Sequence, residues 1–201
     1  MGKAVLMSTQ PKWCADIANL KKPIEVRKSR PKLEIPFKVY IYCTNTPKYH
    51  HLYDLTPYNN GERMYGVTEH NKYSLVVKGY LNGKVIGEFV CDRIDRIGKR
   101  GTNNNFDYCY LSLNEWGNDD IEIEITDIQK SCISKSELNA YGANSSCLYA
   151  WHITDLKIYD KPKELSEFEF PKDNIHLSYR KRNQYFKGIT RPPQSWCYVE
   201  E

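Results

Sequence analysis

Lys22, Glu25 and Arg27 fall within one short stretch, Lys-Pro-Ile-Glu-Val-Arg, and their side chains suit an anionic ligand. In an extended strand, Ile24 and Val26 would share one face, and Glu25 and Arg27 would share the other. The planar donor fork of Arg27 suits a phosphate or a carbonyl group, and Glu25 can orient that fork or accept from the amino group of a base. Lys22 can bind phosphate or, when it is desolvated, act as a base. The alternative is a surface ion pair worth less than about 1 kcal/mol.

Glu88 is the second candidate acid, because it lies in an apolar run, among Val85, Ile86, Phe89 and Val90. A charge in such surroundings needs a partner or a raised pKa, and Lys22 or Arg27 can be that partner. A catalytic Lys22 would need its pKa lowered from about 10.4 toward 7–8 by burial or by a nearby cation. The alternative is that Glu88 faces water on an edge strand.

The dipeptide Trp151-His152 interrupts a long extended run late in the chain. Trp151 can stack on a base, and His152 can read an edge of that base. The alternative for His152 is a structural hydrogen bond. The stretch 44–72, which is rich in Tyr, His, Asn and Pro, is predicted to be an insertion beside the site with one short helix. It can cover a binding pocket or serve as a surface for a partner.

The residues before Lys22 have the pattern of a strand followed by a short helix. Residues 4–7 are apolar and predict a buried strand. Pro11 suits the first turn of a helix, which Ser8 or Thr9 can cap. The apolar stripe of this helix comes from side chains spaced three and four apart, Trp13, Ile17 and Leu20. A second strand is predicted at 24–28.

The rest of the chain predicts strands separated by turns and polar loops. The predicted strands lie at 36–43, 85–91, 108–113, 121–125 and 148–159. Asn82-Gly83 is typical of a hairpin turn before the strand 85–91. A polar loop is predicted at 98–107. Ser134 and Glu137 form a capping-box pattern for a second short helix.

Residues 5–30, with Lys22, Glu25 and Arg27, resemble the ASCH domains, a PUA-related family of small barrels linked to RNA and nucleotides. The signature of that family is a Lys, then Glu or Thr three positions on, then Arg two further, after a helix and a tight turn. The resemblance implies an α+β fold, a small PUA-like mixed β-barrel with two or more short helices packed on it. The implied domain covers 1–165, with the insertion at 44–72.

Two departures from the family pattern lie close to this motif. One branch of the family consists of acetylcytidine amidohydrolases that use a Lys, a Thr and a distant Glu. Glu25 stands at the Thr position, and a carboxylate cannot take the role of a hydroxyl nucleophile unchanged. Leu20 and Lys21 stand where many members have a Gly before the Lys, so Asn19 is expected to supply the turn.

The C-terminal extension, 166–201, is predicted to pack back on the barrel. Its basic and aromatic side chains alternate in a way that suits single-stranded nucleic acid. Alternatively, the Pro-Pro-Gln-Ser-Trp-Cys-Tyr-Val segment returns as an edge strand that closes the sheet, because an apolar end is costly when it is left loose.

Composition narrows the class of protein. The 201 residues carry a net charge of +4, a mild preference for anionic partners. None of the seven cysteines has the spacing of a zinc or haem site, and no cofactor is expected. No secretory signal or membrane-spanning run is visible, so a reduced, cytoplasmic protein is expected. The motifs of NTPases, dinucleotide-binding dehydrogenases, zinc peptidases and serine hydrolases are missing from the sequence.

Three functions remain open at this point. The first is an RNA- or nucleotide-binding domain, with Lys22, Glu25, Arg27, Trp151 and His152 lining a cleft for a base and a phosphate. The second is an amidohydrolase of acylated nucleosides, or a nuclease, with Lys22 as base and Glu25 or Glu88 as acid. The third is a protein-interaction module of phage or prophage origin, a setting that the resemblance implies.

Overall fold

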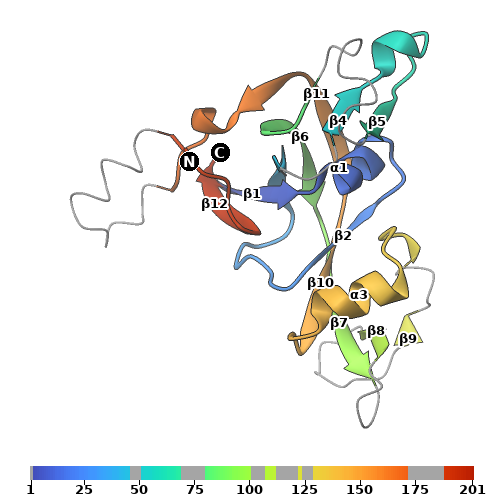
Figure 1. The fold of residues 1–201 in the computed structure, drawn as a ribbon. Helices are drawn as coiled ribbons and strands as arrows, with labels where there is room; N and C mark the ends of the chain where they lie inside the picture. Colours follow the sequence, from blue (N-terminus) through green and yellow to red (C-terminus); the bar gives the residue numbers. More distant parts are fainter. Residues whose placement is uncertain are drawn as a thin grey trace. The chain divides into compact units, whose positions relative to one another are not determined.

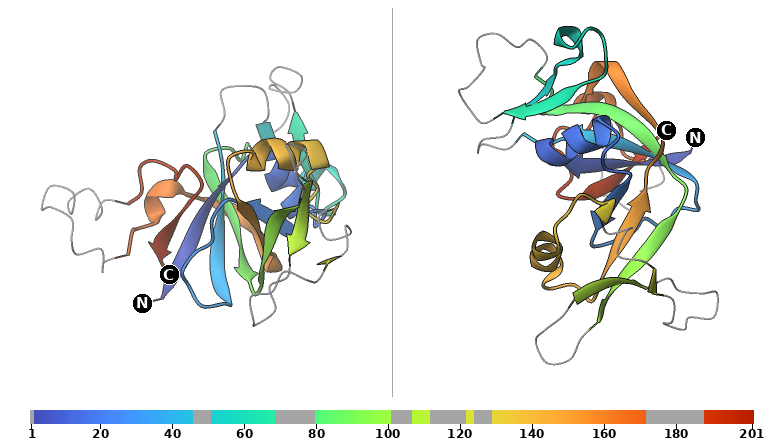
Figure 2. Two further views of the ribbon diagram at one scale, coloured as in Figure 1. Left: turned by 90° about the horizontal axis from the view of Figure 1, so that it is seen from below. Right: turned by 90° about the vertical axis from the view of Figure 1, so that its right-hand side faces the viewer.

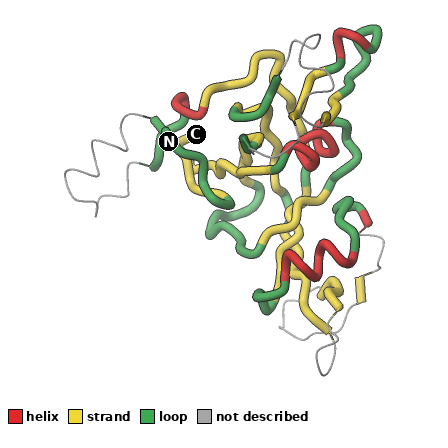
Figure 3. The backbone as a smooth tube through the Cα atoms, viewed as in Figure 1, coloured by secondary structure: helices red, strands yellow, loops and turns green. Residues whose placement is uncertain are grey.

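The computed structural model describes residues 2–45, 51–68, 80–100, 107–111, 122–123, 129–171 and 188–201. They form two compact units. The first unit comprises Met1–Leu20, Phe37–Val90 and Asp155–Glu201, and the second comprises Lys21–Pro36 and Cys91–Thr154. In the part of the chain that is described, strands dominate and helices are short (Figure 3). The fold is therefore α+β, as the sequence predicts.

The first unit is built on a five-stranded sheet with the order β11-β6-β3-β1-β12. Its strands are β1 (Lys3–Thr9), β3 (Phe37–Cys43), β6 (Lys84–Cys91), β11 (Thr154–Glu164) and β12 (Trp196–Glu200). β1 pairs in parallel with β3 and antiparallel with β12, so segments from both ends of the chain lie side by side (Figure 1). A buried cluster that includes Leu6, Tyr40, Val85 and Phe168 packs within this unit. The Trp-Cys-Tyr-Val segment is therefore an edge strand.

Helix α1 (Pro11–Ala18) begins at Pro11, as predicted, but its cap differs from the prediction. Gln10 is the N-cap and makes no side-chain capping hydrogen bond. Ser8 and Thr9 cannot cap the helix, because both belong to β1 and are buried there. The buried face of α1 comes from side chains in the middle and at the end of the helix, Cys14, Ala15, Ile17 and Ala18.

The end of α1 also differs from the prediction. Leu20 is 68% exposed, so it does not extend the apolar stripe of the helix. Leu20, and not Asn19, takes the left-handed conformation, with φ of 62°. The Asn19 side chain instead bonds the backbone of Tyr65 twice, donating to its oxygen at 2.8 Å and accepting from its nitrogen at 2.9 Å. Asn19 therefore ties α1 to the strand that contains Tyr65.

Part of the predicted insertion is a hairpin rather than an irregular loop. β4 (His51–Asp54) pairs antiparallel with β5 (Tyr65–Thr68), and a short 3₁₀ turn, η1 (Thr56–Tyr58), lies between them. The hairpin lies beside α1, as both views in Figure 2 show. The alternation of apolar and polar residues was not visible in the sequence here because each strand is only four residues long. Residues 46–50 and 69–79, which include the first arm of the hairpin predicted at Asn82-Gly83, lie outside the described residues.

The second unit contains a five-stranded sheet with the order β2-β10-β7-β8-β9. Its strands are β2 (Ile24–Arg27), β7 (Ile94–Arg100), β8 (Asp107–Leu111), β9 (Glu122–Ile123) and β10 (Cys147–His152). Strands β7 and β8 together extend into both ends of the predicted loop at 98–107. Of the strand predicted at 121–125, only Glu122 and Ile123 are among the described residues.

Helix α3 (Lys135–Gly142) packs on one face of this second sheet. The predicted capping box is confirmed, because the Ser134 side chain accepts from the Glu137 backbone and the Glu137 side chain accepts from the Ser134 backbone. Leu138 contacts the apolar side chains that the sheet presents to the helix, Ile24, Val26, Ile97, Leu148 and Ala150. In the described part of the chain, no helix is long and apolar enough to cross a membrane.

Replacing Leu20 by Gly should stabilise the protein. Leu20 occupies left-handed space that Gly adopts without strain, and its exposed side chain loses little packing when it is removed. We expect the free energy of unfolding to rise by about 0.5–1 kcal/mol in a denaturant titration. Leu20→Ala is the control, because it trims the same side chain but keeps the strain. An equal gain in both variants would contradict this explanation.

Candidate functional site

The predicted motif strand is fully buried. All four residues of β2 are buried, and the exposed fractions of Glu25 and Arg27 are 5% and 7%. β2 pairs antiparallel with β10, which places Glu25 opposite Trp151 and Arg27 opposite Tyr149. The alternation of β2 is thus as predicted, but the face that carries Glu25 and Arg27 is buried rather than exposed to solvent. The alternative of a surface ion pair is wrong for this reason.

Glu25 holds the three charged side chains together. Its Oε1 lies 2.9 Å from Nη2 of Arg27, and its Oε2 lies 3.5 Å from Nζ of Lys22. Lys22 is 1% exposed and also donates a hydrogen bond to the backbone oxygen of Ser131. We call these three side chains, Lys22, Glu25 and Arg27, the buried ionic cluster.

Burial and charge pull the Lys22 ammonium in opposite directions. Burial lowers the pKa of Lys22, and Glu25 opposes this by favouring the charged form. The net pKa is lowered, as a lysine base would require. However, the Lys22 side chain has no exposed surface, so a ligand cannot reach Nζ in this conformation.

Exposed cations follow the cluster along the chain. Lys28, Arg30 and Lys32 are exposed in the segment that leaves β2. This segment lines an open hollow of about 770 Å³, whose wall is formed by Arg30, Pro31, Lys32, Leu33, Glu34, Ile35 and Ile94. Ile94 is opposite Trp151, which is opposite Glu25, so these three residues share one face of the sheet. The hollow and the cluster therefore lie on the same unit.

Trp151 and His152 do not line one pocket together. They are successive residues of β10, so their side chains leave opposite faces of the sheet. Trp151 is fully buried, which leaves no face on which a base can stack. His152 is opposite Ile24, on the face that α3 covers further along.

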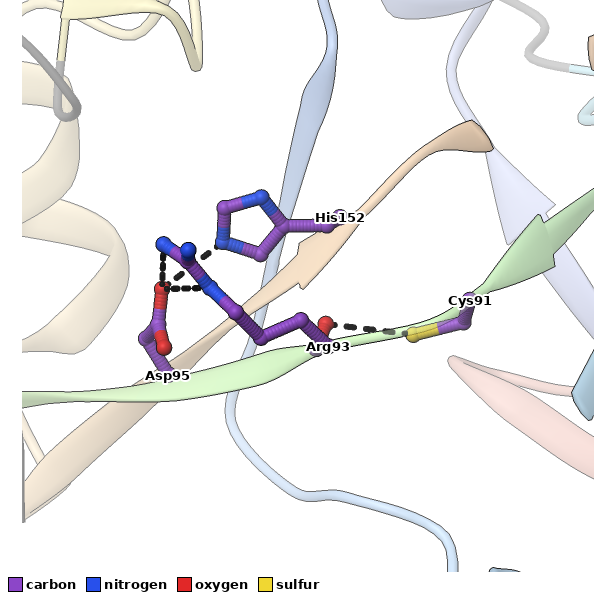
Figure 4. A network of polar contacts seen from close by, with 4 residues as sticks. All are labelled: Cys91, Arg93, Asp95 and His152. Atoms are coloured by element: carbon purple, nitrogen blue, oxygen red, sulfur yellow. Dashed lines mark hydrogen bonds and ion pairs between the residues drawn. The ribbon is translucent and has the colours of Figure 1, made fainter. Parts of the chain in front are cut away.

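His152 belongs to a charged network that the sequence did not reveal. Its Nε2 lies 2.7 Å from Oδ2 of Asp95, and Arg93 donates to the same oxygen from Nε at 3.0 Å and from Nη2 at 2.7 Å (Figure 4). Arg93 and Asp95 stand two apart, and this spacing was a usable signal for two side chains on one face. Their meeting with His152 depends on a strand pairing that local sequence does not specify.

Glu88, the second predicted acid, lies in the first unit on β6. Its side chain is half-buried, and its carboxylate accepts a hydrogen bond from the hydroxyl of Tyr159. Burial, followed by this hydrogen bond, raises the pKa of the Tyr159 hydroxyl, so that hydroxyl remains protonated and keeps donating. The other predicted residues, Lys22, Glu25, Arg27, Trp151 and His152, belong to the second unit.

Glu25→Gln should destabilise the protein strongly. The substitution leaves Lys22 and Arg27 buried without their carboxylate, and breaking a buried ion pair in this way costs about 3–5 kcal/mol. Denaturant unfolding would measure this loss. Glu34→Gln is the matched control, because Glu34 is exposed in the same segment, and its effect should stay within about 0.5 kcal/mol. Equally mild effects in both variants would show that the cluster is not buried in solution.

Asp95 should contribute to stability in a pH-dependent way. Burial raises the pKa of Asp95, but hydrogen bonds from His152 and Arg93 together hold it below its usual value. The charged form therefore stabilises the fold above the unfolded pKa of about 3.9, and this contribution is lost as the pH falls through the folded pKa. We expect the stability difference between the wild type and Asp95→Asn to shrink in acid. A constant difference from pH 7 to about pH 2 would contradict this.

Comparisons with known proteins bear on the fold. No protein-family model matches this sequence, and no curated protein matches it. The crystal structure of ASCH from Zymomonas mobilis is similar, with a TM-score of 0.50 and 14% identity over 98% of this chain and 88% of that chain. A Ser-to-Ala mutant of the same protein gives a TM-score of 0.50 and 15% identity over 98% of this chain and 89% of that one. The chain therefore has an ASCH fold.

Proposed function

We propose that the second unit binds an RNA or a nucleotide-like ligand along the segment Lys21–Pro36. The main observation in support of this proposal is the concentration of exposed cations beside an open hollow. Lys21, Lys28, Arg30 and Lys32 are exposed in this segment, against one exposed carboxylate, Glu34. Phosphate groups are the ligands that such a surface attracts most strongly.

The charge of the whole chain supports this assignment. The segment contains four Lys and two Arg against two Glu, which gives a net charge of +4. The whole chain also carries +4, so the remaining residues are neutral overall, with 23 cations and 23 carboxylates. The segment thus carries a net charge equal to that of the whole chain, and this charge attracts a polyanion.

The hollow offers both kinds of surface that a nucleotide needs. Arg30 and Lys32 provide cations for phosphate, and Pro31, Leu33 and Ile94 provide apolar surface for a base. Such a combination of charge and apolar contact is typical of sites for single-stranded nucleic acid. The buried ionic cluster lies at β2, the strand from which this segment departs. In this proposal, Arg27 is the member of the cluster that solvent reaches most.

The geometry favours binding over the enzymatic alternative. An amidohydrolase or nuclease that used Lys22 as base, with Glu25 or Glu88 as acid, would need both groups at the ligand. Lys22 has no exposed side-chain surface, and both carboxylate oxygens of Glu25 already face cations. Exposed side chains of the segment, in contrast, are accessible without any rearrangement.

Replacing Arg30 and Lys32 together by Gln should weaken the binding of a short uridine oligonucleotide at low salt. For a single strand, each lost phosphate contact makes the plot of log affinity against log salt shallower by about 0.7, so the two substitutions together should reduce its steepness by about 1.4. Fluorescence anisotropy across a salt series would measure both quantities. The melting temperature should stay unchanged, because both side chains are exposed.

The matched control removes the same charge from the first unit. Lys157 and Lys161 are exposed on β11, and the Lys157→Gln, Lys161→Gln double variant should keep the wild-type slope and nearly the wild-type affinity. Equal losses of affinity in both double variants would show that the effect comes from the net charge of the protein and not from this segment. No binding by the wild type at low salt would reject the proposal and favour a protein-interaction module.

A further inference from the structure

A second charged site lies on the other face of the same sheet. Arg93, Asp95 and His152 share this face, because Asp95 and Ile97 alternate with Ile94 and Arg96 along β7. The buried ionic cluster and the hollow do not include any of these three side chains. The network therefore has no role in the proposed function and needs its own explanation.

His152 is held at one ring nitrogen and open at the other. Nε2 faces Asp95 at 2.7 Å, and the backbone N–H of His152 donates to the oxygen of Arg93 at 3.0 Å. Among the described residues, none makes a hydrogen bond with Nδ1. The side chain is 19% exposed, so the ring is fixed in place but reachable from solvent. A carboxylate that anchors one nitrogen fixes the direction in which the other nitrogen points.

The His152 ring has both charged and uncharged groups near it. In the described part of the chain, Asp95 and Arg93 are the charged groups that contact this network, and Cys91 donates to the backbone oxygen of Arg93 (Figure 4). Burial raises the pKa of Cys91 to about 12, so that thiol stays neutral. β2 contributes the uncharged Ile24 beside the ring. Protonation of His152 adds one positive charge beside Asp95 and Arg93.

We propose that Arg93, Asp95 and His152 form an oxyanion-binding site that is filled when His152 is protonated. Asp95 keeps the ring oriented through Nε2, and Nδ1–H then donates to an oxygen of a sulfate or phosphate group. The guanidinium of Arg93, which is 53% exposed, holds Oδ2 of Asp95 beside the ring and adds positive charge to the network. A charge-assisted hydrogen bond of this kind is roughly twice as strong as a neutral one.

A sulfate titration followed by NMR of the histidine ring tests this site directly. Sulfate keeps the same charge between about pH 5.5 and pH 8, the range in which an ordinary imidazole changes its charge. We expect saturable shifts of the His152 ring signals at the lower pH and at least roughly tenfold weaker binding at the higher pH. The phosphodiester of uridylyl-uridine, which also keeps its charge, serves as a second probe and should show the same dependence.

Two substitutions of equal charge separate a built site from a general attraction. Asp95→Asn removes the anchor of His152, whereas Asp92→Asn removes an exposed carboxylate three residues away that does not contact the ring. Each raises the net charge by one. The proposal expects weaker sulfate binding at about pH 5.5 in Asp95→Asn and equal or tighter binding in Asp92→Asn.

The sulfate experiments test the His152 site independently of any RNA binding on the other face of the sheet. His152→Gln should abolish the pH-dependent part of sulfate binding, and His51→Gln, a histidine of the first unit, should leave it intact. No shift of the His152 ring at the lower pH would overturn the proposal, as would equal binding at both pH values. Tighter binding in Asp95→Asn would also overturn it, because simple electrostatics predicts that result. The wild-type titration is decisive even if a variant fails to fold.

Discussion

The enclosure of Glu25 between two buried cations is the constraint on which the second unit depends. A carboxylate inside a sheet is costly unless its charge is matched, and here one oxygen faces Arg27 and the other faces Lys22. Lys22 in turn bonds the backbone of Ser131, just before α3. The cluster thus joins the motif strand to the turn that leads into the helix. Its buried charges and the exposed cations beyond them belong to one continuous piece of chain.

Local patterns predicted local structure well. Pro11, the capping box at Ser134 and the alternation of β2 and β3 all produced the expected elements, because each depends on neighbours in sequence. The alternation of apolar and charged residues along a strand cannot distinguish a charged face that is exposed to solvent from a buried face whose charges pair with each other. The burial of Lys22 and Arg27 could therefore not be predicted from the sequence. The left-handed conformation of Leu20 was missed because Asn is the more usual residue in that region.

The parts of the site that depend on strand pairing were the hardest to predict. Arg93 and Asp95 meet His152 because β7 pairs with β10, and these strands are separated by about fifty residues of sequence. The same pairing sends Trp151 and His152 to opposite faces, which separates two residues that look like one motif in the sequence. The sheet therefore carries a cationic hollow on one face and the histidine network on the other.

The pairing of β1 with β12 also affects how the protein is made. These strands lie at opposite ends of the described chain, so the sheet of the first unit is incomplete until β12 has left the ribosome. The second unit needs only residues up to Thr154 and can assemble while translation continues. Until then the outer edge of β1 stays unpaired, and such edges recruit other strands. During synthesis, that edge is therefore a place that a chaperone can protect.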